Sequence, residues 1–317
     1  MWATVRHELT HMRGQILGWG VSLGLLGAYL TSVFNSFQAQ MEQLKQVMGY
    51  FPPELFEFFN IDLATLTPFR MLDIKFFSLM PIILGIFAML ACSNMLAGDE
   101  EKGLLDLVLA HPVSRRSLFF GKVLAFVVAF IAILAIMWVA ISLFMDRAVL
   151  QVTPIQMLWP MVSLFAAVLI FGAIALLLSM ALPSRRMAWS VSLFLAIASF
   201  FVDGMAEIEP SLKQVAKLMP YAYYQGAEAA FGLNVGWVIG LVAPAVVFML
   251  LAWWRFERRD IRVAGEGGWH IPLPAWLRPS RRRRPAEARP ATWGRISPSP
   301  LGAQPRSKRR IRRAQSC

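Results

Sequence analysis

Long apolar stretches without Asp, Glu, Lys or Arg recur along the first 254 residues of the chain. Crossing the hydrocarbon core of a bilayer takes about 20 mostly apolar residues in a helix. Six stretches meet this requirement: 14–41 (most apolar at 16–34), 76–98, 123–145, 158–182 (within the charge-free 148–184), 187–206 (interrupted by Asp203) and 229–254. The pattern predicts an all-α, polytopic membrane protein with six transmembrane helices.

The segments before the first two spans also have a helical pattern. Residues 6–13, RHELTHMR, mix charges with Leu9 and Met12, which predicts an N-terminal interfacial helix on the membrane surface. Residues 35–72 show a helical pattern followed by a proline break. We expect a small ordered cap there.

The segment before the sixth span has a different composition. Residues 208–231 contain Pro210, Pro220 and the sequence YAYY at 221–224. These features predict a broken helix that is partly immersed in the membrane, with tyrosines at the interface. Within the sixth span, GWVIG at 236–240 is a small-xxx-small pattern that indicates close approach of another helix.

Charge divides the chain into two parts. Of its 317 residues, 57% are hydrophobic and 16% charged, a low charged share for a soluble domain. Residues 1–254 carry 14 basic and 15 acidic side chains, whereas residues 255–317 carry 17 basic and 4 acidic ones with 8 of the 19 prolines. The net charge of +12 therefore belongs to the tail. We expect a membrane domain over residues 1–262 and a disordered, cytoplasmic tail over residues 263–317.

The basic residues between the spans predict the orientation, because positive charge near membrane ends stays in the cytoplasm. With the N-terminus inside, the inner segments hold eight basic residues and the outer segments six, before the tail is counted. The tail makes this bias decisive, and the even number of spans agrees with it. We expect a multi-pass plasma-membrane protein with both termini in the cytoplasm.

The most informative segment, GDEEKGLLDLVLAHPVSRRSLFFGK at residues 98–122, lies between the second and third spans. An acidic cluster precedes a glycine that permits a bend, and the apolar residues that follow form a short helix that a proline ends. A serine can cap the next helix, and the basic residues after it suit the membrane surface. The residues that carry this pattern are Glu100, Glu101, Gly103, Leu105, Leu107, Leu109, Pro112, Ser114, Arg115 and Lys122. A short apolar helix outside the bilayer must bury its face, and a groove on a cytoplasmic partner is the expected place.

This segment resembles the first cytoplasmic loop of the permease subunits of type-2 ATP-binding-cassette (ABC) exporters. Those loops typically read as an acidic cluster, Gly-Thr-Leu-Glu, a leucine-rich turn, Pro-x-Ser-Arg and a lysine at the next span. The chain departs from them at Leu104, usually Thr, and at Asp106, usually Glu. LMPYAYY at 218–224 and FERRDI at 256–261 are also similar to family segments, so the resemblance covers residues 1–262.

The resemblance implies that the short helix is a coupling helix docking into a separate ATPase subunit. Closure of two ATPase subunits around ATP would drive the membrane helices between inward-open and outward-open states. Glu101, Gly103, Leu105, Leu107 and Pro112 would shape the coupling helix, and Arg115 with Lys122 would anchor it at the lipid headgroups.

Partners and cargo follow from the same resemblance. It implies a second permease copy or a related chain as a dimer partner, and ATP with Mg on the ATPase subunit, while this chain binds no cofactor. Drugs, antibiotics, lipids, peptides and polysaccharides are all allowed as cargo. The apolar spans favour amphipathic or hydrophobic molecules among them.

The chain has no phosphate-binding motif of its own. Gly98 and Gly103 have the spacing of the G-x-x-x-x-G-K-[ST] loop, but two leucines follow instead of Lys-Ser/Thr. His7 and His11 are four residues apart without a nearby third ligand, so a metal site is not expected. Energy for transport would have to come from the partner.

Ionisable residues within spans are functional candidates because they are costly there. Asp203, near the outer end of the fifth span, would contact either cargo or lipid headgroups, and the nearby Glu207 and Glu209 favour headgroups. The candidates for a translocation path or outer gate are Asp203, Pro220, Tyr221 and Tyr223.

Other interpretations remain open at this stage. A membrane-embedded enzyme, such as a lipid-modifying transferase or an intramembrane protease, would need catalytic groups at one depth in several spans, and only Asp203 qualifies. A non-transporting anchor or assembly factor is the third possibility, against which the coupling-like loop argues.

In the tail, RRRR at 281–284 and RSKRRIRR at 306–313 would attract anionic membrane lipids. Nucleic acid is disfavoured as a partner, and a dispensable extension is an equal interpretation of the tail.

Overall fold

The computed structural model describes residues 2–37, 68–101, 114–145, 152–182 and 184–258. These residues belong to one compact unit, Met1–Trp269. Their regular secondary structure is helical, and no strand occurs among them. Most of the expected cap at 35–72, the expected coupling helix and the basic tail lie outside the described residues.

Six helical stretches are long and apolar enough to cross a membrane, as the sequence predicts. The long helices are α1 (Trp2–Phe37), α5 (Met80–Asn94), α8 (Arg115–Phe144), α10 (Leu158–Ala181), α11 (Arg185–Ile208) and α13 (Val235–Arg258). The second span also takes in part of α4 (Pro68–Lys75) and the 3₁₀ turn η3 (Phe77–Leu79). The remaining elements are short: α6 (Ala97–Glu101), η4 (Pro210–Leu212), α12 (Lys213–Ala216), η5 (Pro220–Tyr223) and η6 (Gly226–Ala230).

Capping residues, rather than the edges of the apolar stretches, decide where two of these helices begin. The helix α8 starts well before residue 123 because the Ser114 hydroxyl accepts a hydrogen bond from the Ser117 N–H at 3.2 Å. The helix α13 starts after residue 229 because the preceding residues form η6 and Asn234 accepts from the Gly236 N–H at 3.0 Å. The predicted number of spans and the predicted Ser114 cap are confirmed, whereas the predicted start of the sixth span at residue 229 is wrong by more than a turn.

Three glycines allow α1 to pack closely along α8. A Cβ on Gly24 would lie 2.8 Å from the Ala140 Cβ, and one on Gly27 would lie 2.7 Å from the Ile141 Cγ1. Gly20 faces α8 in the same way, whereas Gly18 has open space. The absence of side chains therefore sets how near the two backbones come.

The GWVIG pattern, by contrast, does not mark a close helix approach. A Cβ on Gly240 would lie 4.0 Å from the Tyr223 ring, an ordinary contact, and one on Gly236 would meet only Asn234 of its own cap. The expectation of a tight helix pair at residues 236–240 is wrong for the described contacts. The close pair uses Gly20 and Gly24, which have the same spacing.

The other long helices gather around α10, which packs against α5, α11 and α13. In the most apolar part of α10, 72% of the residues are buried. In α13 the corresponding share is 17%, because its apolar side chains face outward. Phenylalanines fill the space between this group and the α1–α8 pair. Phe126 of α8 stacks on Phe87 of α5 with ring centroids 6.4 Å apart, and Phe130 stacks on Phe165 of α10 at 5.7 Å.

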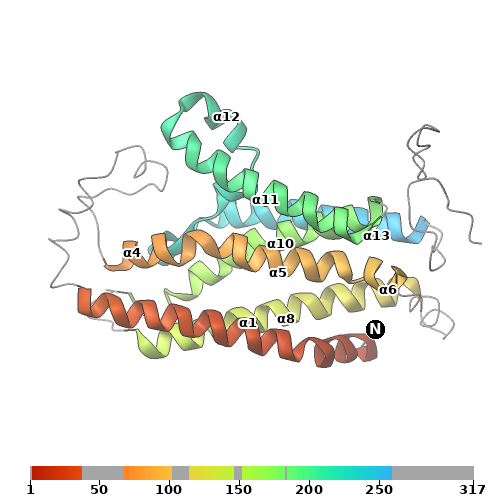
Figure 1. Cartoon of the computed structure of the whole chain (residues 1–317), viewed down its shortest axis with the longest axis horizontal. Coiled ribbons are helices and arrows are strands. Elements are labelled where there is room, and N and C mark those ends of the chain that lie inside the picture. Colours follow the sequence, from red (N-terminus) through yellow and green to blue (C-terminus); the bar gives the residue numbers. More distant parts are fainter. Residues whose placement is uncertain (1, 38–67, 102–113, 146–151, 183, 259–317) are drawn as a thin grey trace, which may run out of the picture. The chain divides into compact units, whose positions relative to one another are not determined.

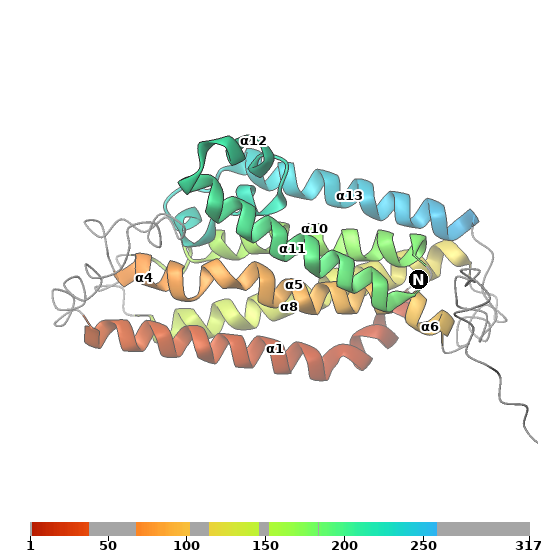
Figure 2. The same cartoon turned by 45° about the horizontal axis from the view of Figure 1, so that its top comes forward.

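Successive spans run in opposite directions, so that the start of α1 and the end of α13 lie at the same end of this unit (Figures 1 and 2). We call this the α6 end, because it holds α6 with the first turns of α1, α8 and α11 and the last turns of α13. The opposite end holds α4, η3 and residues 209–234.

Candidate functional site

A buried ion cluster joins three elements at the α6 end. Lys122 of α8 places its Nζ 2.6 Å from Glu8 Oε1 of α1 and 2.7 Å from Asp99 Oδ2 of α6. The lysine side chain is 7% exposed, so both carboxylates are needed to replace its lost hydration. The expected position of Lys122 at the lipid headgroups is wrong: the side chain lies on the face of α8 that meets α1 and α6, where the two carboxylates bind the ammonium inside the bundle.

A second ion pair lies on the other side of α6. Arg185 of α11 donates from Nε to Glu101 Oε2 at 2.7 Å and from Nη1 to Asn94 Oδ1 at 2.6 Å. The pair is partly exposed, with 36% of the arginine and 44% of the glutamate side chain accessible. Gly98 leaves the space that Asn94 occupies, since a Cβ there would lie 1.9 Å from Asn94 Oδ1.

A third pair joins α8 to the end of α13. Arg116 donates from Nε to Glu257 Oε1 at 2.7 Å, and its guanidinium lies 5.7 Å from the centre of the Trp253 ring. Arg258 likewise lies 4.4 Å from the Trp254 ring. Such pairs of tryptophan and arginine are typical of the boundary between lipid and water.

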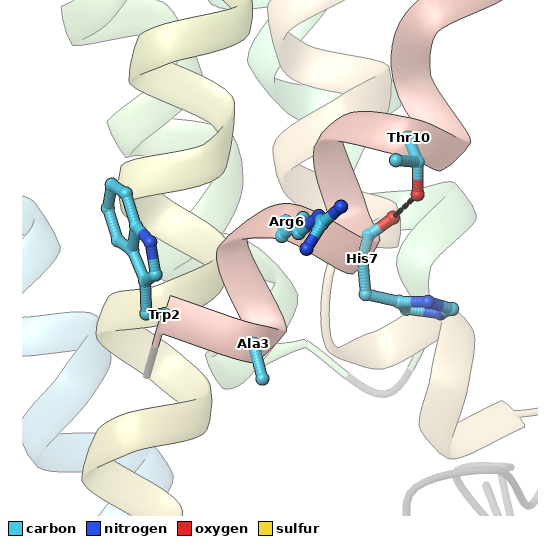
Figure 3. A pocket seen from close by; sticks show the side chains of 5 residues that line it. All are labelled: Trp2, Ala3, Arg6, His7 and Thr10. Carbon is cyan, nitrogen blue, oxygen red and sulfur yellow. Dashed lines mark hydrogen bonds between the residues drawn. The ribbon is translucent and has the colours of Figure 1, made fainter.

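The first turns of α1 are amphipathic, as the sequence predicts for residues 6–13. Val5 is buried, while Trp2, Arg6 and His7 are exposed. Figure 3 shows Trp2, Ala3, Arg6, His7 and Thr10 around a shallow hollow on the outer side of these turns. The turns continue directly into the spanning part of α1, so they are not a separate helix, although the ribbon changes direction there.

At the opposite end, tyrosine side chains hydrogen-bond the backbone of η3. The Tyr224 hydroxyl donates to the Phe77 carbonyl oxygen at 3.0 Å, and the Tyr221 hydroxyl donates to that of Ser78. The Tyr221 N–H donates to Ser199 Oγ at 2.9 Å. These bonds fix the broken segment that follows α11 against the start of the second span.

Burial raises the pKa of both Tyr221 and Tyr224 above the ordinary range, so that these hydroxyls remain donors. The negative charge of Asp203 on α11 further raises the pKa of Tyr221. Pro220 begins η5, and the Tyr223 hydroxyl donates to the Lys217 carbonyl oxygen at 2.8 Å. The four candidates for a path or outer gate therefore belong to one region, and no cargo contact is assigned to them.

The Asp73 carboxylate binds residues near 227, in the later part of the segment between α11 and α13. Its Oδ1 accepts a hydrogen bond from the Ala227 N–H at 2.7 Å, and Arg70 pairs with both Asp73 and Glu228. Gly226 has φ +54°, and a Cβ on it would lie 2.5 Å from Asp73 Oδ1. Sequence reasoning missed this cluster because Arg70 and Asp73 lie more than 150 residues before the groups that they contact, Glu228 and the Ala227 N–H.

Comparison with known protein families gives a match that includes the residues of both ends described above. A family model described as ABC-2 family transporter protein matches residues 2–261. The chain belongs to the ABC-2 transporter family. A search of curated proteins found no match. Membership makes this chain a multi-pass membrane component of an ABC transporter, a part that is distinct from the ATPase.

Within this ABC-2 protein, the expected coupling loop falls between described elements. Gly103, Leu105, Leu107, Leu109 and Pro112 lie outside the described residues. Glu100 and Glu101 end α6 before the loop, and Ser114 and Arg115 begin α8 after it. The structure therefore places the two attachment points of the loop at the α6 end.

Proposed function

We propose that this chain is the permease subunit of an ATP-driven exporter that works by alternating access. A separate ABC ATPase subunit, carrying ATP and Mg, docks on residues 102–113, and a second copy or a related permease completes the path. The main support for the proposal is the match of the ABC-2 family model to residues 2–261. The sequence of the loop supports its role as the docking segment, since six of its residues are Leu or Val.

The α6 end faces the cytoplasm in this proposal, and the membrane is the plasma membrane. The basic side chains Arg6, Arg13, Arg115, Arg116, Arg185, Arg186, Arg255 and Arg258 belong to this end. Positive charge beside membrane ends favours the cytoplasmic side. The arginine–tryptophan contacts of α13 support a headgroup level at the same place.

Docking is tested by co-purifying the chain with a candidate ATPase after Leu107→Asp or Gly103→Pro. A charge in the apolar face, or a proline in the helix, should remove the ATPase from the complex and the permease-dependent part of ATP turnover. Leu218→Asp is the matched control, because Leu218 is 82% exposed at the opposite end. If the ATPase stays bound with unchanged turnover in both loop variants, the docking proposal fails.

Orientation is tested with an impermeant maleimide on intact cells, in a Cys317→Ser chain in which the remaining cysteine, Cys92, is buried. Leu218→Cys should be labelled from outside, and Thr10→Cys only after the membrane is permeabilised. Labelling of Thr10→Cys in intact cells would place the α6 end outside and overturn this part of the proposal.

A further inference from the structure

The short helix α6 carries two acidic side chains that bind in different directions. Asp99 and Glu101 are two residues apart, and positions i and i+2 of a helix do not face each other. Asp99 accordingly pairs with Lys122 of α8, whereas Glu101 pairs with Arg185 of α11. Five residues of helix, which follow α5 after Met95 and Leu96 and pack against it, thus form ion pairs with two different long helices.

Those two long helices belong to different groups. The helix α8 packs along α1, while α11 packs against α5 and α10. Phenylalanine rings fill the space between the groups, and the hydrophobic contribution of such contacts has no preferred direction. The directional contacts between the groups therefore include the ion pairs of α6. These pairs fix the position of the α1–α8 pair relative to the α10 group more sharply than apolar packing does.

The two sides of α6 differ in burial and hence in strength. Lys122 is 7% exposed and bound by two carboxylates, so separating it from Asp99 would leave buried charge unpaired. Arg185 and Glu101 are 36% and 44% exposed, so water can replace the contacts of Glu101 with the guanidinium and with the Arg185 N–H, which donates to Glu101 Oε1 at 3.2 Å. Arg185 also keeps its bond to Asn94 of α5 when Glu101 leaves.

From these contacts we propose that α6 is a two-sided ionic joint: it moves with α1 and α8 through Lys122, and separates from α11 at the Glu101–Arg185 pair. Displacement of the loop that follows α6 then shifts the α1–α8 pair relative to the α10 group. Gly98 itself places no side chain between α6 and Asn94, whose side chain fills that space. The inference rests on the proposed coupling function and names the contact at which that coupling acts.

A reversible cross-link tests where the joint opens. With Cys92 and Cys317 replaced by alanine, Glu101→Cys with Arg185→Cys is bridged by a cleavable thiol reagent in the complex with the ATPase. The matched control is Arg70→Cys with Glu228→Cys, an ion pair between elements of the opposite end, where no opening is proposed. We expect the first bridge to abolish the permease-dependent part of ATP turnover, with recovery after reduction, and the control bridge to leave it intact.

Three results separate the possibilities. If the unbridged complex shows no ATPase binding, the proposed function itself fails. If the ATPase binds but both bridges have the same effect on turnover, the joint does not open at Arg185 and the inference is wrong. A charge exchange, Glu101→Arg with Arg185→Glu, should retain turnover that Glu101→Arg alone loses, and failure of that rescue also counts against the joint.

Discussion

At the α6 end, ion pairs between side chains connect neighbouring helices, whereas at the opposite end tyrosine, serine and aspartate side chains hydrogen-bond the backbone. Lys122, Arg185 and Arg116 each reach a carboxylate on another element. Tyr224 and Asp73 instead bind a carbonyl oxygen and an N–H group. The opposite end also has an ion pair between elements, Arg70 with Glu228, but bonds to the backbone are what attach residues 209–234 to η3 and to Asp73.

The difference has a structural cause. Residues 209–234 form short turns rather than a long helix, so part of their backbone needs partners from other elements. Tyrosine hydroxyls and the Asp73 carboxylate meet that need and fix the course of the chain. At the α6 end, regular helices satisfy their own backbone, and side chains are free to connect one helix to another.

The consequence concerns movement. A bond between a side chain and the backbone of a buried segment holds a particular residue in place, while water can replace either partner of an exposed ion pair. At the Glu101–Arg185 pair this includes the exposed Arg185 N–H, which donates to Glu101 Oε1 at 3.2 Å. We therefore expect the α6 end to rearrange during transport and the opposite end to keep its local hydrogen bonds. Four substitutions test this contrast, ordered here from the largest expected effect to the smallest.

Removal of the buried lysine should have the largest effect. Lys122→Met leaves Glu8 and Asp99 facing each other without a cation, and breaking a buried pair costs about 3–5 kcal/mol. We expect less folded protein and a lower unfolding temperature in lipid nanodiscs. Adding Glu8→Gln and Asp99→Asn should recover much of the loss. A Lys122→Met protein as stable as the wild type would show that the cluster does not hold the three elements.

Gly226→Ala, at the opposite end, should have the second-largest effect. The residue has φ +54°, where an L side chain costs about 1–2 kcal/mol, and its Cβ would lie 2.5 Å from Asp73 Oδ1. Gly232→Ala is the control, since a Cβ there has open space. We expect faster hydrogen exchange in peptides covering residues 220–234 for Gly226→Ala alone. Equal exchange in both variants would mean that Asp73 does not fix this segment.

These two sites also show how far sequence reasoning reaches. The six spans were predictable because the membrane requires long apolar helices, and Ser114 was recognisable as a cap from its place before a helix. The partners of Lys122 were not predictable, because Glu8 and Asp99 lie 114 and 23 residues away and no local pattern records their contact. Spacing alone also could not distinguish the glycines of α1, which contact α8, from those at 236–240.

Tyr224→Phe should have a smaller effect. It removes the donor to the Phe77 carbonyl oxygen, and a hydrogen bond of this kind contributes about 1 kcal/mol. Tyr223→Phe is the control, because the Tyr223 hydroxyl binds the Lys217 carbonyl oxygen within the same exposed segment. We expect a lower unfolding temperature for Tyr224→Phe than for Tyr223→Phe. The reverse order would contradict the role of Tyr224 in attaching this segment to η3.

Arg116→Ala should have the smallest effect. The pair with Glu257 is exposed, at 69% for the arginine and 31% for the glutamate, and such pairs contribute about 0–1 kcal/mol. Salt screens exposed charges, so the difference from wild type should shrink further between low and high ionic strength. Arg186→Ala, at another exposed arginine of the α6 end, is the control. A loss from Arg116→Ala as large as that from Lys122→Met would break the contrast, because burial would then not determine which ionic contacts at this end are fixed and which are free to separate.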